Sequence, residues 1–170
     1  MRRSDFVVTS TYGSLGSGTT NTDVVHQMVG DDNNFYVPDF YNDRIKKHSL
    51  NDLTYVSKYG SYGTATSSLN LPSGIFVDDT RLTVADSGNK RLVNLDKSTY
   101  AFVSSVSVNY NVSAPEAYIL GNSKYKFLIY SRTNEQNLGL LDVILEKRNV
   151  SDDSLASSIK ILPDGITMSS

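Results

Sequence analysis

Apolar residues occur in short runs along most of the chain, and Gly, Asn, Asp and Ser cluster between the runs. Short apolar runs bounded by such residues are typical of strands and hairpins. In the clearest unit they predict strands at residues 74–77, 81–85, 91–95 and 100–108. No segment keeps the apolar spacing of a capped helix over two or more turns, so we expect almost no helix.

The turns of this unit are expected at three clusters of polar residues. Asp78-Asp79 follows the first strand, Ser87-Gly88-Asn89 the second and Asp96-Lys97-Ser98 the third. Gly and Asn tolerate a positive φ better than other residues do. We therefore expect Gly88 and Asn89 to adopt that conformation in a tight turn.

The unit recurs along the chain with a period of about 47 residues. The element Tyr12-Gly13-Ser14-Leu15-Gly16 returns as Tyr59-Gly60-Ser61-Tyr62-Gly63, and Asp39 and Arg44 return as Asp86 and Arg91. A third copy is fainter: residues 138–142 match 92–96, and Ser131 stands where the Asp is expected. Near the end, residues 162–166 echo 71–75. The blade-like units span residues 23–62, 69–108 and 115–162.

Four antiparallel strands in about 47 residues correspond to one propeller blade. The sequence therefore predicts an all-β, single-domain partial β-propeller, residues 1–170, with about three four-stranded blades. Because closed propellers have about four to eight blades, residues 6–16 and 163–168 are expected to be strands of composite blades. Two copies joined head to tail would then close a six-bladed ring.

Two other arrangements fit the same pattern. The chain can be a piece of a longer propeller, or the third unit and the terminal strands can close a small four-bladed ring. The second arrangement is open because either 143–150 or 157–162 can be the fourth strand of the third unit.

Residues 69–96, LNLPSGIFVDDTRLTVADSGNKRLVNLD, resemble an NHL repeat, with its Pro-x-Gly-Ile-x-Val-Asp, Val-Ala-Asp and Gly-Asn-x-Arg elements. Residues 25–60 are similar, with Val37-Pro38-Asp39 in place of Val-Ala-Asp, and the third unit departs further. The resemblance implies a β-propeller, most often six-bladed, that acts mainly as an interaction platform. Some family members bind RNA, and some related propellers are enzymes.

Charge and composition narrow the choice of function. The 170 residues include 16 Lys and Arg against 18 Asp and Glu, so no basic excess points to nucleic acid or an anionic membrane. The chain has no Cys, which excludes disulfides and thiolate metal sites. No signal peptide or membrane-spanning apolar stretch is visible, so we expect a soluble protein; its compartment is not indicated.

The two Asp–Arg pairs are the charged residues that stand out most. Asp39 with Arg44, and Asp86 with Arg91, each bracket a predicted hairpin turn. A carboxylate that ends one strand can accept a bidentate contact from a guanidinium that starts the next, together with turn amides. A repeated pair in a repeated hairpin favours a structural role over a catalytic one, and we predict no catalytic residue.

Other candidates concern binding. The cationic cluster Arg44-Ile45-Lys46-Lys47-His48 is a partner-binding candidate, although alternate residues of a strand face opposite ways. Tyr41, Tyr59 and Tyr62 can form a binding surface or pack between blades. Asp31 and Asp78 are weak candidates for Ca²⁺ ligands, which require about six oxygens. His26 and His48 lack metal-site spacing, so no metal or other cofactor is expected.

The leading functional hypothesis is a non-catalytic scaffold or binding module for a protein or glycan, as a structural component of a larger assembly such as a virion or cell-surface complex. No nucleophile elbow, P-loop or dinucleotide fingerprint occurs. Self-association is expected, nucleic acid is disfavoured and membrane insertion is not expected. One alternative is a metal-dependent propeller hydrolase or lyase; a further one is an RNA-binding propeller of the NHL type.

Overall fold

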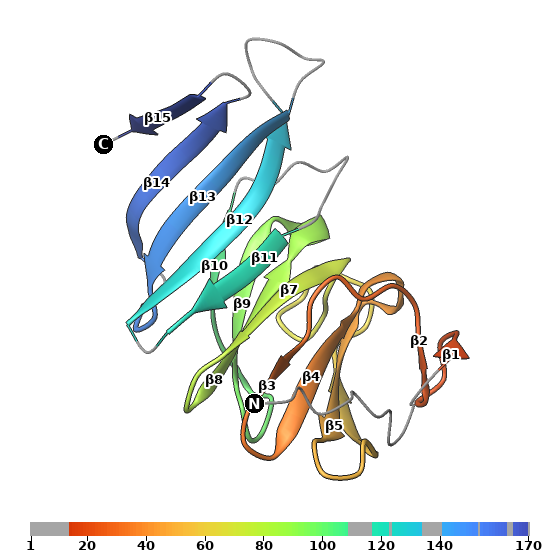
Figure 1. Ribbon diagram of the computed structural model, residues 1–170. Helices are drawn as coiled ribbons and strands as arrows, with labels where there is room; N and C mark the ends of the chain where they lie inside the picture. The colour runs from red at the N-terminus through yellow and green to blue at the C-terminus, as the bar shows by residue number, and fades with distance from the viewer. Residues whose placement is uncertain are drawn as a thin grey trace, which may run out of the picture.

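The computed structural model describes residues 14–108, 117–122, 124–133, 141–152, 154–162 and 165–169. In this part of the chain three antiparallel sheets follow one another and are arranged like the blades of a fan (Figure 1). The only helical segments within these ranges are the single 3₁₀ turns Phe40–Asn42 and Ser87–Asn89. The protein is therefore all-β and forms a partial β-propeller, as the sequence predicts.

The first and second sheets each contain four strands in chain order. The first consists of β3 (Val29–Gly30), β4 (Asn34–Asp39), β5 (Arg44–Ser49) and β6 (Tyr55–Tyr59). The second consists of β7 (Pro72–Val77), β8 (Arg81–Asp86), β9 (Arg91–Asp96) and β10 (Phe102–Ser107). Each strand of the second sheet overlaps the strand predicted for it and differs from it by at most two residues at either end.

A short parallel pair precedes the first sheet. Its strands are β1 (Ser14–Leu15) and β2 (Asn21–Thr22). An isolated parallel bridge between Tyr62 and Leu69 repeats the Leu15–Thr22 pairing 47 residues later. Residues 6–13 lie outside the described ranges, so their assignment to a preceding blade stays a prediction.

The third sheet has five strands. They are β11 (Ala117–Gly121), β12 (Tyr125–Thr133), β13 (Leu141–Asn149), β14 (Leu155–Leu162) and β15 (Gly165–Ser169), in that order. The third strand is therefore 141–149, and the short match at 138–142 misplaced it. In the single chain β15 pairs antiparallel with β14, where the sequence predicted the first strand of another blade at 163–168.

The turns place positive φ one residue later than the sequence predicts. Lys90 has φ 54°, and Asp43, at the equivalent point of the first sheet, has φ 52°. Each follows a 3₁₀ turn and donates its N–H back to the first residue of that turn. Gly88 serves close packing instead, because a Cβ there would lie 2.5 Å from the side chain of Asn70.

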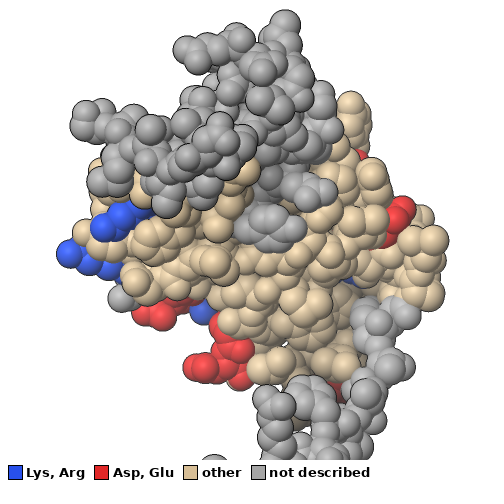
Figure 2. Space-filling model, turned by 45° about the horizontal axis from the view of Figure 1, so that its top comes forward, with Lys and Arg blue, Asp and Glu red and all other residues tan. Residues whose placement is uncertain are grey.

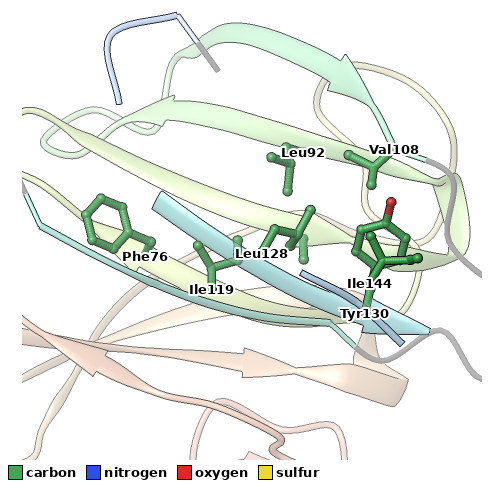
Figure 3. Packing of buried hydrophobic residues seen from close by; sticks show 8 residues of the cluster. Phe76, Leu92, Val108, Ile119, Leu128, Tyr130 and Ile144 are labelled. Atoms are coloured by element: carbon green, nitrogen blue, oxygen red, sulfur yellow. The ribbon is translucent and has the colours of Figure 1, made fainter. Parts of the chain in front are cut away.

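Two apolar clusters hold the sheets together. One lies between the first and second sheets and includes Tyr36, Ile45, Leu82 and Val93. The other joins the second and third sheets (Figure 3) and contains Phe76, Ala85, Leu92, Val108, Ile119, Leu128, Tyr130 and Ile144. Because side chains alternate across a strand, β8 and β9 supply both clusters. The second sheet is therefore buried on both faces.

No helix among the described residues is long and apolar enough to cross a bilayer.

Candidate functional site

The first Asp–Arg pair lies at the hairpin between β4 and β5. Arg44 Nε donates to Asp39 Oδ2 at 2.8 Å, and both side chains are buried. The other carboxylate oxygen, Oδ1, accepts the backbone N–H of Asp23 at 2.6 Å and the side-chain amide of Asn42 at 2.8 Å. The carboxylate thus receives a single guanidinium N–H, where the sequence suggested a bidentate contact.

The remaining donors of this hairpin bind the chain segment that enters the sheet. Arg44 Nη2 donates to the carbonyl oxygens of Gly18 at 2.8 Å and Asn21 at 3.2 Å. Asn42 Nδ2 donates to the carbonyl oxygen of Gly16 at 3.0 Å. We call this arrangement the Asp–Arg clamp, because the ion pair holds the incoming segment against the hairpin.

The clamp recurs in the second sheet, 47 residues later. Arg91 Nε donates to Asp86 Oδ2 at 2.6 Å, and Asp86 Oδ1 accepts the N–H of Asn70 at 2.7 Å. Asn89, the counterpart of Asn42, donates to Asp86 Oδ2 and to the carbonyl oxygen of Gly63. The Arg91 guanidinium also donates to the carbonyl oxygens of Thr64, Ala65 and Ser68.

The clamp carboxylates are buried, and burial determines how much the loss of a clamp residue destabilises the protein. Burial raises the pKa of Asp86, while Asn89, the amide of Asn70 and Arg91 act in the opposite direction. A buried ion pair contributes little beyond its apolar replacement, but removing one partner leaves an uncompensated charge. The clamp residues are therefore expected to tolerate little change.

The third sheet has no Asp–Arg clamp among its described residues. At the equivalent hairpin position Tyr130 lies opposite Ile144, while Ser131, the residue suggested by the sequence match, lies opposite Val143. The Tyr130 hydroxyl donates to Glu146 Oε1 at 2.7 Å, and Arg148 Nε donates to Glu146 Oε2 at 2.7 Å. A different buried polar group thus replaces the clamp.

The cationic cluster is divided between two faces of β5, as strand alternation requires. Arg44 is buried, and Lys46 is fully buried with its Nζ bonded to the carbonyl oxygen of Asn21 and to Thr22 Oγ1. Burial lowers the pKa of Lys46; Asp39 opposes this change and Arg44 adds to it. These two candidates for partner binding therefore lie inside the protein.

Other members of the cluster also have partners. His48 is buried, and its ring stacks on Phe35 with centroids 4.9 Å apart. Lys47 lies on the opposite face and is half-buried, with Nζ 5.7 Å from the centroid of the Tyr36 ring. Lys47 is therefore the remaining lysine of the cluster with access to solvent.

The three candidate tyrosines differ in exposure. Tyr41 is 60% exposed and Tyr62 is 76% exposed. Tyr59 is half-buried, its hydroxyl donates to the carbonyl oxygen of Thr66, and burial raises its pKa. Tyr41 and Tyr62 can therefore contact a partner, while Tyr59 packs within the protein.

The candidate metal ligands Asp31 and Asp78 begin equivalent turns. Asp31 Oδ1 accepts the N–H groups of Asn33 and Asn34, and Asp78 Oδ1 accepts those of Thr80 and Arg81. Burial acts to raise the pKa of Asp31, but these amides, the Tyr36 hydroxyl and Lys97 outweigh it and lower the pKa to about 2. No group of three or more ionisable metal-ligand side chains gathers in the described ranges.

A cavity of about 400 Å³ lies beside Asp78, where the second and third sheets meet. Phe76, Val77, Gly121 and Val150 form its apolar part. Gly121 is required there, because a Cβ would lie 2.8 Å from the Phe76 ring and 2.7 Å from the Tyr125 carbonyl oxygen. The cavity thus combines an apolar wall with a carboxylate rim.

Sequence reasoning missed Gln27, which joins the segment before the first sheet to the second and third sheets. Its Nε2 donates to the carbonyl oxygen of Ile119, and its Oε1 accepts the N–H groups of Ile119 and Ile75. The position 47 residues later is Gly74, so the repeat gives no signal for this residue. By contrast Asn42 and Asn89 are 47 residues apart, and this spacing in the sequence could have indicated that both belong to the clamps.

No family model and no curated protein matches the chain. Among solved structures, the Neurospora crassa Pan2 WD40 domain matches with a TM-score of 0.55 at 6% identity, over 79% of this chain and 35% of that one. The chain folds as part of a β-propeller. Its NHL resemblance, without a family match, stays a prediction.

Two further solved structures agree with this fold. A Bacteroides fragilis protein described as exported has a TM-score of 0.58 at 12% identity, over 85% of this chain and 40% of that one. Kuenenia stuttgartiensis hydrazine synthase has a TM-score of 0.58 at 12% identity, over 89% of this chain and 44% of that one. This partial propeller spans less than half the length of each. At such identities the likeness shows the fold alone.

Proposed function

We propose that this partial propeller is a non-catalytic scaffold that binds a protein or glycan partner and completes its ring with a second copy, within a larger assembly such as a virion or cell-surface complex. The proposal rests mainly on the two Asp–Arg clamps, which contain the charged residues that stand out most in the sequence. In each clamp the carboxylate bonds to the guanidinium, Asp39 to Arg44 and Asp86 to Arg91, and the guanidinium also bonds to backbone carbonyl oxygens. The role of the clamps is therefore to hold loops in place for recognition.

The surface supports recognition by polar and aromatic groups. On the face shown in Figure 2 most of the described surface is neither acidic nor basic, and the charged side chains form small separate groups. Tyr41 and Tyr62 are among the exposed large side chains. Tyrosine combines an apolar ring with a hydroxyl, which suits contacts with proteins and sugars.

The outward face of the third sheet supports pairing with a second copy. The face toward the second sheet buries Leu128 and Ile144. On the opposite face Ile129, Leu145 and Ile159 lie in one row across three strands and are only half-buried. A further blade would cover this row, as the third sheet covers the second.

Binding of the purified protein to an array of immobilised glycans and candidate surface proteins tests the recognition role. We expect saturable binding that Tyr41→Ser and Tyr62→Ser together weaken about tenfold, since hot spots are rich in Tyr. Both residues are exposed, so the fold should be unaffected. Stoichiometric bound metal together with hydrolytic or lyase activity would overturn the proposal in favour of an enzyme.

A further inference from the structure

The cavity beside Asp78 has a counterpart between the first and second sheets. That second site, of about 210 Å³, is lined by Asp31, Tyr36 and Lys97, among others. There Lys97 Nζ lies 3.4 Å from Asp31 Oδ2 and crosses the junction between the sheets. The first two sheets are thus connected by the chain's own lysine.

Backbone hydrogen bonds identify the residue that replaces Lys97 at the next junction. Lys97 N–H donates to the carbonyl oxygen of Thr80, two residues after Asp78 in its turn. Val150 N–H donates in the same way to the carbonyl oxygen of Lys124, two residues after Asn122 in the third turn. Val150 therefore occupies in the third sheet the position that Lys97 occupies in the second.

This replacement leaves a carboxylate without the lysine found at the earlier junction. Asp78 is equivalent to Asp31, and its hydrogen bonds from Thr80 and Arg81 all fall on Oδ1. In Asp31 the other oxygen, Oδ2, accepts Tyr36 and Lys97. In the described ranges no hydrogen bond reaches Oδ2 of Asp78, and the larger cavity lies beside it.

We propose that this cavity binds a primary alkylammonium group, such as the lysine side chain of a partner protein. Val150, Val77 and Phe76 would contact the aliphatic stem, and Asp78 Oδ2 would accept the ammonium, as Asp31 does from Lys97. Asp79 is exposed at the same rim and adds negative charge. Arg81 also lines the cavity, and its charge repels cations. Its Nη1 donates to the carbonyl oxygen of Ser151, so we expect the ammonium group to enter from the Asp79 side.

The inference names the chemistry of a partner, and in that respect it rests on the proposed binding role. It does not require ring closure. A binding experiment with a short peptide therefore separates the two, because the peptide can fail to bind while the protein self-associates, and the reverse.

The test compares acetyl-Gly-Gly-Lys-Gly-Gly-amide with the same peptide carrying norleucine, which keeps the stem without the charge. Backbone amide NMR shifts of the full-length protein report the site. We expect saturable shifts at Gly121, Asn122 and Val150 with a Kd of about 1 mM, and at least tenfold weaker binding of the norleucine peptide. n-Butylammonium chloride distinguishes a lysine of a partner protein from a free small amine. Weaker binding of butylammonium than of the lysine peptide indicates a protein partner, and equal binding indicates a small amine.

Substitutions place the effect at the cavity. Val150→Lys should supply the missing lysine from within the chain and abolish peptide binding, with an unchanged or higher unfolding midpoint. The matched control is Leu50→Lys, which adds the same charge at the equivalent, exposed position of the first sheet and should leave binding unchanged. Asp78→Asn should weaken binding about tenfold. Equal binding of the two peptides, or undiminished binding by a folded Val150→Lys protein, would overturn the inference.

Discussion

The side-chain amide of Gln27 pairs with the main chain of Ile119 in both directions. Its Nε2 donates to the Ile119 carbonyl oxygen at 2.6 Å, and its Oε1 accepts the Ile119 N–H at 3.0 Å. The two residues are 92 positions apart. One side chain thus connects the segment before the first sheet to the first strand of the third, and it also accepts the Ile75 N–H at the edge of the second.

Replacing this amide should destabilise the whole arrangement. Gln27→Ala leaves main-chain groups of Ile119 and Ile75 without their partner, and an unsatisfied group costs about 1–3 kcal/mol. Urea unfolding followed by circular dichroism measures the change. The neighbouring control, Met28→Ala, removes a side chain that is 60% exposed and should stay within about 0.5 kcal/mol of the wild type. Equal midpoints for Gln27→Ala and the wild type would contradict the predicted role.

Removing the carboxylate of the first clamp should cost more than removing that of the second. Asp39→Asn leaves both Arg44 and Lys46 without their carboxylate, and a buried charge without its partner costs about 3–5 kcal/mol. In the second clamp Val93 takes the place of Lys46, so Asp86→Asn should cost less.

Chemical denaturation of both variants, with the exposed Asp52→Asn as control, tests this order. The control should change the free energy of unfolding by less than about 0.5 kcal/mol. A smaller loss for Asp39→Asn than for Asp86→Asn would show that Lys46 does not depend on Asp39.

His48 should make stability depend on pH. Burial, reinforced by the charge of Lys46, lowers its pKa from the ordinary value of 6.5. In the unfolded chain His48 therefore binds a proton at a higher pH than in the folded protein. Between these two values the unfolded state holds more protons, so the free energy of unfolding falls as the pH drops below about 6.5.

Urea midpoints between pH 5 and pH 8 measure this dependence. The wild type should lose stability on the acid side of this window, and His48→Gln should flatten the profile because the titrating group is gone. If His48→Gln keeps the wild-type slope, another group is responsible for it.

A charge on the outward face of the third sheet should block pairing with a second copy. Leu145→Lys places an ammonium in the centre of the half-buried row, where another blade would have to bury it. We expect the variant to sediment as a monomer and to unfold cooperatively. Val103→Lys, at a 49% exposed position of the second sheet, is the control and should sediment like the wild type. A dimeric, folded Leu145→Lys protein would place the contact elsewhere.

The sequence predicted the features that depend on local patterning. The strands of the second sheet and both Asp–Arg pairs follow from alternation and from a spacing of 47 residues. It could not show that Arg44 and Arg91 bind the carbonyl oxygens of a preceding segment, because a carbonyl group is common to every residue. Nor could it show that Lys46 is buried, because the residues that bind its Nζ, Asn21 and Thr22, lie 25 and 24 positions earlier in the chain.

The third sheet was harder to predict for a physical reason. Its strands β12 and β13 are longer than those of the first two sheets, so the repeat spacing shifts and the match at 138–142 fell too early. At the clamp position the third sheet has Tyr130 and Ile144, and these residue types form no motif that marks the position in the sequence. The structural equivalence of Val150 and Lys97 can be recognised only from their backbone hydrogen bonds.

The solution mass of the purified protein tests the central claim most directly. Light scattering coupled to size-exclusion chromatography, over protein concentrations from about 1 to 100 μM, distinguishes a single chain of 18.7 kDa from a pair. If two copies complete the ring, the mass should be about twice that of the chain and should fall to the single-chain value for Leu145→Lys. A folded wild-type protein at 18.7 kDa throughout this range would contradict the proposed pairing.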